Sequence, residues 1–248
     1  MKTIKKFVLL IIGLIALTML NSCEDDRFGN SGSSGGKRLV KITNFLGVDM
    51  TFHYKDGKLI EMVDETNREK IYFTYSGKTV KISGDAYGSE QLILHLNNDG
   101  FAESGTFEGY ELGFEYSNGY LTKYIDFYDG STVSIKYDTN GNLSTMQYST
   151  KYNATEEYTF TSSNYPTKGK SYCFVTGSAR FEELIPVYYA GLLGKDPKNF
   201  VSKVDITRYT NNTITHTFSN YSFYDDGYIK TMTVTDDWNK DDMSFTYQ

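Results

Sequence analysis

Apolar and polar residues alternate along most of the chain after residue 38, with the period of two that indicates β-strands. In five segments the apolar positions end on a tyrosine or leucine, namely Tyr54, Tyr75, Leu96, Tyr116 and Tyr137. These positions are 21, 21, 20 and 21 residues apart, which is the length of two strands and two turns. The spacing predicts a repeat of β-hairpins that form a sheet with one apolar face and one mixed face.

Short turns ending in glycine follow these strands. Five of the six repeat copies carry Asp-Gly or Asn-Gly at the turn, as in Asp56-Gly57 and Asn118-Gly119. Such pairs accept positive φ at both central positions of a type I′ turn, whose twist matches that of antiparallel strands. We therefore expect type I′ turns at these hairpins.

The repeat breaks in two places. Before the final hairpin the apolar phase shifts to Tyr221 and Phe223, which predicts a β-bulge there. Residues 166–200 lose the alternation, and Pro186 is placed to be the first residue of a short helix that stops at Gly194. We expect this helical insert, near residues 179–200, to lie on the apolar face of the sheet.

The predicted fold is mainly β, an antiparallel meander of repeated hairpins that forms one large twisted or curled sheet. It occupies residues 38–248 as a single domain, with the insert at about 166–200. Hairpin repeats define local pairing but not closure, so these patterns leave open whether the sheet closes into a barrel.

The N-terminus has the pattern of an export signal. Three lysines precede an apolar run from Phe7 to Leu20, which is shorter than a membrane-spanning helix needs to be. The run ends in Leu20-Asn21-Ser22-Cys23, which resembles the bacterial lipobox, although Asn21 departs from the usual small or β-branched residue. We expect residues 1–22 to be a lipoprotein signal peptide and Cys23 to be lipidated. An ordinary secreted protein, cleaved elsewhere, is the alternative.

Residues 23–37 are predicted to be a flexible tether, because they are rich in Gly, Ser and acidic residues that bury almost nothing. The triplet Glu24-Asp25-Asp26 resembles the surface-export signal of Bacteroidetes-type lipoproteins. The resemblance implies an outer-membrane lipoprotein on the cell surface rather than on the periplasmic face. A solvated run of charges explains the same triplet.

The composition fits an exported strand-rich domain. Tyrosines number 22 and prolines only 3, which is typical of β-sheet. The net charge is −6, and loss of the signal peptide removes three further lysines and no acid, which argues against a nucleic-acid partner. Cys173 has no partner if Cys23 is acylated, so we expect no disulfide and interpret Cys173 as a buried small hydrophobe.

One segment resembles a known repeat. Tyr137-Asp138-Thr139-Asn140-Gly141-Asn142-Leu143 looks like a single YD repeat of the RHS type. Together with the lipobox, the tether and the insert around residues 189–199, it resembles an uncharacterised lipoprotein family of Bacteroidetes. The resemblance implies a β-rich, surface-anchored domain of unknown function and supplies no catalytic residue.

The sequence offers no catalytic or metal-binding motif, and we expect no cofactor. His53 and His95 fall on the outer face two repeats apart, about 20 Å in a regular sheet, so they cannot share a metal ion. His216 stands alone. Residues 237–241 space oxygen ligands like the start of a calcium loop, but Asp242 stands in place of its glycine and Gln248 in place of its final glutamate. A hairpin joining Met232 to Phe245 is therefore the preferred interpretation. Glu182 and Glu183 are adjacent at a helix start and do not suggest a hydrolase pair.

Four aromatic residues are candidate ligand contacts. Tyr72, Tyr124 and Tyr148 fall outside the main apolar phase, and Trp238 lies in an acidic loop, so some of these rings are expected to be exposed. Exposed rings beside hydroxyls and carboxylates can stack on and hydrogen-bond a sugar or a polypeptide. A simpler explanation of these tyrosines is that the residue suits the partly solvent-exposed positions of a wide sheet.

The favoured hypothesis is a non-catalytic, lipid-anchored envelope protein that binds a glycan or a protein. One alternative is an extracytoplasmic hydrolase whose carboxylates meet only in the folded state. Another is an accessory subunit that packs on an envelope complex, which predicts an apolar surface left uncovered by the insert.

Overall fold

The computed structural model describes residues 36–248 except 46, 152–154, 171–183, 209–212 and 237–238. The signal peptide, Cys23, most of the tether, Cys173, Glu182, Glu183 and Trp238 lie outside the described residues. Within the described residues, sixteen strands account for most of the chain. They are β1 (Leu39–Phe45), β2 (Val48–Lys55), β3 (Lys58–Asp64), β4 (Glu69–Ser76), β5 (Thr79–Gly84), β6 (Leu92–Leu96), β7 (Ala102–Phe107), β8 (Tyr110–Ser117), β9 (Tyr120–Asp126), β10 (Ser131–Tyr137), β11 (Leu143–Ser149), β12 (Thr155–Pro166), β13 (Asn199–Thr207), β14 (Thr213–Phe223), β15 (Ile229–Thr235) and β16 (Lys240–Tyr247). A 3₁₀ turn, η1 (Asp85–Tyr87), and a helix, α1 (Leu184–Tyr189), complete the described elements.

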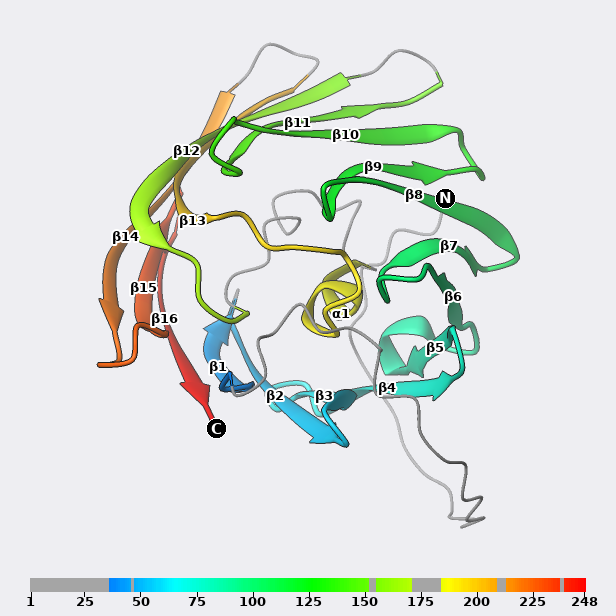
Figure 1. The fold of residues 1–248 in the computed structure, drawn as a ribbon. Coiled ribbons are helices and arrows are strands. Elements are labelled where there is room, and N and C mark those ends of the chain that lie inside the picture. The colour runs from blue at the N-terminus through cyan, green and yellow to red at the C-terminus, as the bar shows by residue number, and fades with distance from the viewer. Residues whose placement is uncertain (1–35, 46, 152–154, 171–183, 209–212, 237–238) are drawn as a thin grey trace.

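The strands form a closed antiparallel barrel in chain order (Figure 1). Each strand pairs with its neighbours in sequence, and β1 closes the circle by pairing with β16, where Ile42 lies opposite Phe245. The expected meander of hairpins is therefore confirmed. The sequence left open whether the sheet closes, and the structure shows a closed barrel, which leaves no unpaired edge among these strands.

The alternation along the strands separates the inside of the barrel from the outside. The inward residues of successive hairpins are buried, namely Phe52, Phe73, Leu94, Phe114 and Ile135. The next residue in each strand is exposed on the outer face: His53, Thr74, His95, Glu115 and Lys136. The predicted apolar face is thus the lumen side, and the mixed face is the outer wall.

Two kinds of glycine turn join the hairpins. Asp56-Gly57 and Asn118-Gly119 have positive φ at both residues, as predicted for type I′, and so does Glu108-Gly109. At Gly100, Gly141 and Gly227 only the glycine has positive φ. These three turns close through longer loops, as in the bond from the Asp138 N–H to the Asn142 carbonyl at 2.8 Å, so the expected type I′ geometry is wrong there.

The insert between β12 and β13 enters the lumen. Figure 1 shows α1 in the middle of the barrel, enclosed by the strands. Pro186 lies inside the helix rather than at its start, and Val187 and Leu193 are buried against the inner wall. The apolar face that the insert was expected to cover is therefore the inside of the barrel. None of the described helices is long and apolar enough to cross a membrane.

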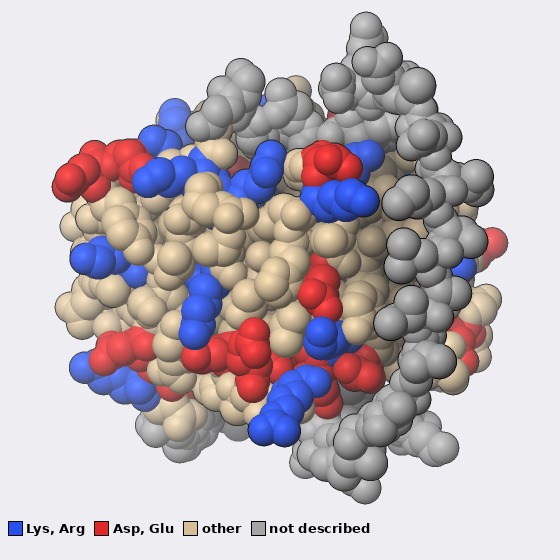
Figure 2. All heavy atoms as spheres, turned by 90° about the horizontal axis from the view of Figure 1, so that it is seen from below, with Lys and Arg blue, Asp and Glu red and all other residues tan. Residues whose placement is uncertain are grey.

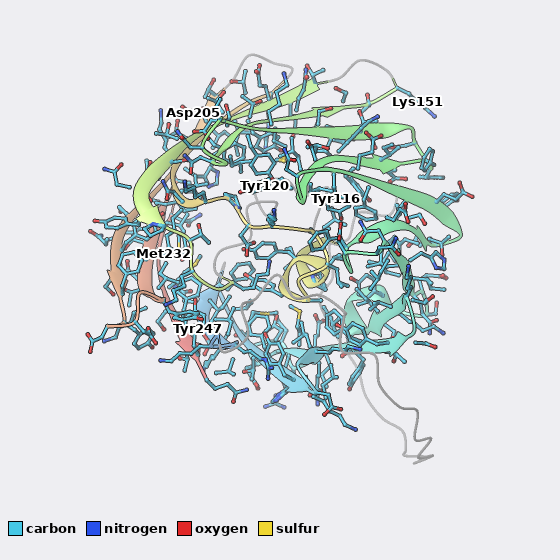
Figure 3. The ribbon with its side chains drawn as sticks, in the orientation of Figure 1. Tyr116, Tyr120, Lys151, Asp205, Met232 and Tyr247 are labelled. Carbon is cyan, nitrogen blue, oxygen red and sulfur yellow. The ribbon has the colours of Figure 1, made fainter. Side chains whose placement is uncertain are left out.

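Backbone hydrogen bonds fix the insert to the hairpins around it. The Leu192 carbonyl accepts from the Ala102 N–H at 2.8 Å, and the Lys195 N–H donates to the Gly119 carbonyl at 2.8 Å. The repeat tyrosine Tyr116 donates its hydroxyl to the Leu192 carbonyl at 3.3 Å. In Figure 3, Tyr116 and Tyr120 point into the lumen. Tyrosines of the repeat thus support the insert as well as their own hairpins.

Candidate functional site

The outer wall of the barrel carries charges of both signs (Figure 2). Several of them pair between neighbouring strands: the Lys70 Nζ lies 3.0 Å from the Glu61 Oε1, and the Lys123 Nζ lies 3.2 Å from the Glu115 Oε1. A lysine on the lipid-facing side of a membrane barrel costs about 2–4 kcal/mol at the bilayer midplane. The wall therefore has the polarity of a surface that faces water.

The lumen has the opposite character. Fully buried side chains there include Ile42 of β1, Val80 of β5, Leu94 of β6 and Val187 of α1. A water-filled channel needs a polar inner face, which alternates with an apolar outer face along each strand. In this barrel the inner face is apolar and the outer face is charged, which is the reverse of that arrangement. The insert also occupies the space that a channel would use.

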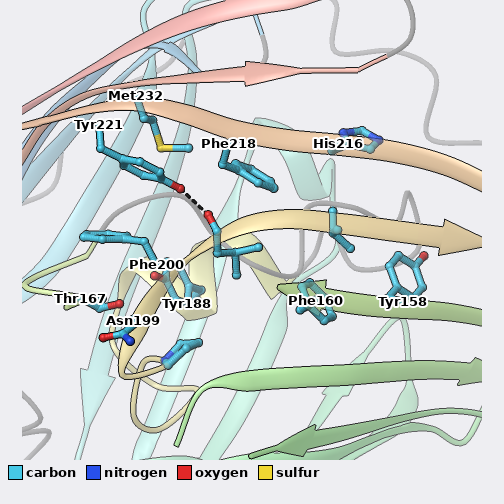
Figure 4. A pocket seen from close by; sticks show the side chains of 13 residues that line it. Tyr158, Phe160, Thr167, Tyr188, Asn199, Phe200, His216, Phe218, Tyr221 and Met232 are labelled. Atoms are coloured by element: carbon cyan, nitrogen blue, oxygen red, sulfur yellow. Dashed lines mark hydrogen bonds between the residues drawn. The ribbon is translucent and has the colours of Figure 1, made fainter. Parts of the chain in front are cut away.

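A cavity of about 50 Å³ lies between the wall formed by β12–β15 and the insert (Figure 4). Ten of its thirteen lining residues are apolar or aromatic. The apolar and aromatic lining residues include Tyr158, Phe160, Phe200, Phe218, Tyr221 and Met232. On β13 the lining extends from Asn199 to Val204, about 16 Å at 3.3 Å per residue. We call this the cleft.

Three polar side chains also line the cleft: Thr167, Asn199 and His216. Among the described residues, none of the three side chains makes a hydrogen bond or ion pair, so their polar atoms are available to a ligand. The described lining contains no Asp, Glu, Lys or Arg. An apolar pocket with a few polar groups is the usual form of a ligand-binding site, and the lack of Asp, Glu, Lys and Arg in the described lining favours a neutral ligand.

Two of the three tyrosines that line the cleft donate hydrogen bonds through their hydroxyls. Tyr158 donates to the Glu156 Oε2 at 2.9 Å, and Tyr221 donates to the Val201 carbonyl, as the dashed line in Figure 4 marks. Burial raises the pKa of the Tyr221 hydroxyl, which therefore stays protonated and remains a donor at neutral pH. These bonds hold the rings in place as walls of the cleft.

A row of rings leads from the cleft to the surface. Phe200 stacks on Tyr221 with centroids 5.7 Å apart, and Tyr221 stacks on Phe223 at 6.4 Å with an interplanar angle of 12°. Tyr165, at the end of β12, lies 5.0 Å from Phe223 and is 46% exposed. The predicted bulge is present in β14, where the register with β15 shifts between Ser219 and Phe223. It turns Tyr221 and Phe223 to the inner side.

The aromatic residues singled out in the sequence are not brought together. Tyr72 is 45% exposed on the outer wall of β4, as expected. Tyr124 and Tyr148 are buried, so their expected exposure is wrong. A bulge in each hairpin skips one residue of β9 and of β11, which places Tyr124 opposite Phe114 and Tyr148 opposite Val133 on the inner face.

The histidines also occupy separate places. His53 lies on the outer wall with its Nε2 3.7 Å from the Glu61 Oε2, and His95 lies there beside Thr79. His216 faces the cleft, which its isolation in the sequence did not indicate. In the described part of the chain, no group of three or more His, Cys, Asp or Glu is placed to hold a metal ion. The hairpin joining Met232 to Phe245 is confirmed by the pairing of β15 with β16.

Comparison with protein-family models finds no match, and no curated protein matches the chain. Solved structures with a similar fold include a porin-like protein from Bacteroides uniformis ATCC 8492, with a TM-score of 0.62 and 15% identity, over 85% of this chain and 96% of that chain. A porin-like protein from Bacteroides vulgatus ATCC 8482 has a TM-score of 0.57 and 13% identity, over 86% of this chain and 99% of that chain. At these identities the likeness shows that the chain shares the barrel fold of these proteins.

Proposed function

We propose that this chain is a non-catalytic binding protein of the outer membrane, held by a lipid on Cys23, whose barrel stands in water and binds a neutral glycan in the cleft. The lipobox and tether support the anchor, and the porin-like barrels with the same fold support the outer-membrane location. The charged outer wall favours a barrel beside the bilayer rather than across it.

The observation that carries the binding role is the cleft with its row of rings. The apolar C–H face of a sugar stacks on an aromatic ring, and its hydroxyls need uncharged donors and acceptors nearby. Phe223 and Tyr165 provide such rings at the surface, while Asn199 and His216 provide polar atoms in the lining. The cavity itself is small, so it would accept one end of a chain whose remainder lies on the rings.

Hydrolysis in the cleft finds no support. A glycosidase needs two carboxyl groups about 5–10 Å apart across the scissile bond. The described lining of the cleft has none. Binding without turnover is therefore the better proposal for this site.

The decisive experiment measures binding of neutral oligosaccharides of different sugar composition to the purified residues 23–248, by saturation-transfer NMR and calorimetry. Tyr165→Ala removes the exposed ring at the end of the row, and we expect it to weaken binding at least tenfold. Tyr72→Ala is the matched control, because that ring is equally exposed but lies on the outer wall. Absence of binding by every neutral sugar, or equal binding by Tyr165→Ala, would contradict the proposal.

The location is tested separately. Protease treatment of intact cells that express the full chain, followed by immunoblotting, should remove the domain if it stands on the outer surface. Cys23→Ala should release the protein from the membrane. Protection until the outer membrane is opened would place the domain on the periplasmic face.

A further inference from the structure

The two ends of the barrel differ. Because neighbouring strands alternate in direction, the chain start at Leu39, the end of β16 and the insert all lie at one end, the near rim. The turns from β7 to β8 and from β9 to β10 lie at the opposite end, the far rim. The described part of the chain enters the barrel at the near rim, where Lys37 precedes Leu39, so the far rim is the end away from this point of entry.

An aromatic patch lies at the far rim. Tyr110, Phe127 and Tyr128 are 41%, 56% and 62% exposed, and they are three of the five large hydrophobic residues that are exposed in the described part of the chain. The Tyr110 and Tyr128 ring centroids are 4.0 Å apart. Exposed apolar residues are ordinary when scattered, but adjacent rings of this size mark an interaction surface.

The patch is held in place by its own backbone. The Phe127 N–H donates to the Glu111 carbonyl at 3.1 Å, and the Tyr128 N–H donates to the Asp126 Oδ1 at 2.9 Å. The Phe127 ring lies over Gly113, where a Cβ would come within 3.2 Å of a ring carbon. The absence of a side chain at Gly113 therefore leaves room for the Phe127 ring. These contacts form the aromatic surface without a bound partner.

Four carboxylates lie next to these rings in the sequence: Glu108 and Glu111 beside Tyr110, and Asp126 and Asp129 beside Phe127 and Tyr128. Among the described residues none of the four carboxylates is in an ion pair, and burial together with Asp129 raises the pKa of Asp126. The neighbouring cation is Lys151, whose Cβ lies 3.6 Å from the position of a Cβ built on Gly130. The patch has an excess of negative charge and three π faces.

We propose that the far rim is a docking surface for a basic segment of a partner protein, with Lys or Arg side chains lying over Tyr110 and Tyr128 and paired with these carboxylates. Cations bind to the faces of aromatic rings, and arginine and aromatic residues are enriched in protein interfaces. This site is separate from the cleft and does not depend on glycan binding.

The test measures fluorescence anisotropy of a labelled ten-residue peptide of alternating Arg and Ser with purified residues 23–248 at low salt. A peptide with Glu in place of Arg is the control ligand. The double variant Phe127→Ser/Tyr128→Ser leaves the net charge unchanged, so it separates the patch from general attraction to an acidic protein. We expect it to weaken binding of the Arg peptide at least tenfold, while Tyr72→Ala binds as the wild type does.

A second variant keeps the test decisive if the double substitution disturbs the fold. Glu108→Gln/Glu111→Gln changes two exposed side chains, and we expect weaker binding with a shallower dependence on salt. Equal binding of the Arg and Glu peptides, or wild-type binding by both variants, would overturn the proposal. Self-association in ultracentrifugation that disappears in Phe127→Ser/Tyr128→Ser would instead identify a second copy of this chain as the occupant.

Discussion

Lys170 and Asp196 form an ion pair across the neck of the insert, with the Lys170 Nζ 2.9 and 3.0 Å from the two carboxylate oxygens of Asp196. The same Nζ lies 4.3 Å from the centroid of the Tyr188 ring, and the Tyr247 hydroxyl donates to the Lys170 carbonyl at 2.8 Å. The pair therefore joins both ends of the insert to each other and to the last strand of the barrel.

Loss of this pair should loosen the insert. Lys170→Met leaves the partly buried Asp196 carboxylate without its partner, and we expect a loss of about 1–3 kcal/mol in the free energy of unfolding. Urea unfolding of Lys170→Met, Asp196→Asn and the double variant should give a coupling energy of about 1 kcal/mol or more. The matched cycle at the exposed pair Lys123–Glu115 should give a coupling below about 1 kcal/mol. Equal couplings at the two pairs would show that the neck contributes no special stability.

Glu69 predicts a dependence of stability on pH. Burial raises the pKa of the Glu69 carboxyl, and the nearby Asp64 and Asp85 raise it further, while its Oε2 has no hydrogen-bond partner among the described residues. The folded state therefore favours the protonated carboxyl. The protonated Glu69 contributes fully to the free energy of unfolding below pH 4.5, which is the pKa of this carboxyl in the unfolded chain. This contribution is lost as the pH rises through the higher pKa that the carboxyl has in the folded protein.

Glutamine at position 69 cannot ionise, so it should remove the decrease in stability that ionisation of Glu69 causes at higher pH. We expect Glu69→Gln to have a higher Tm than the wild type at pH 7 and nearly the same Tm at pH 4. Thermal unfolding at the two pH values measures the difference. A variant that is less stable at pH 7 would mean that the ionised carboxylate is favourable in its site.

Alanine substitutions at Gly194 and Gly191 can distinguish the cost of a steric clash from the cost of backbone strain. Both have positive φ, +83° and +76°. A Cβ on Gly194 would lie 2.5 Å from the Gly119 carbonyl oxygen, whereas one on Gly191 meets nothing within 4 Å. We expect Gly191→Ala to cost about 1 kcal/mol through strain alone, and Gly194→Ala to cost about 2 kcal/mol or more. Chemical denaturation of both variants checks this, and equal losses would refute a contact between the insert and the β8–β9 turn.

The exchanged polarity of the barrel predicts that it does not form a channel. In planar bilayers, the purified domain should give no discrete conductance steps, because the charged wall disfavours insertion and the lumen is packed with apolar side chains. A porin of known conductance, added to the same bilayers, is the positive control. Stepwise conductance from this chain would contradict the assignment of the outer wall to water.

The hairpins could be predicted because each is local. The positions of Tyr54, Tyr75, Tyr116 and Tyr137 reflect two strands and two turns, and the pairing of each hairpin needs only its own residues. Closure could not be predicted, since it depends on how β1 meets β16 at the far end of the chain. The orientations of Tyr124 and Tyr148 were missed because a bulge shifts the phase by one residue inside each hairpin.

The cleft was missed for a related reason. Its lining comes from the four strands β12 to β15 and from the insert, so no single segment carries a recognisable motif. The phase shift at Tyr221 and Phe223 was visible in the sequence, but its consequence appears only when Phe200 and Tyr165 are placed beside those rings. Residues that meet through tertiary packing leave little trace in the order of the chain.

The pairing of β1 with β16 also sets the order in which the barrel can be assembled. Of the described strands, β1 is the first to emerge during synthesis or export, and its partner β16 is the last. Until then β1 has a free hydrogen-bonding edge, and such edges pair readily with other chains. A chain interrupted before β16 would keep two open edges, so completion of the last strand is the step that protects this domain from aggregation.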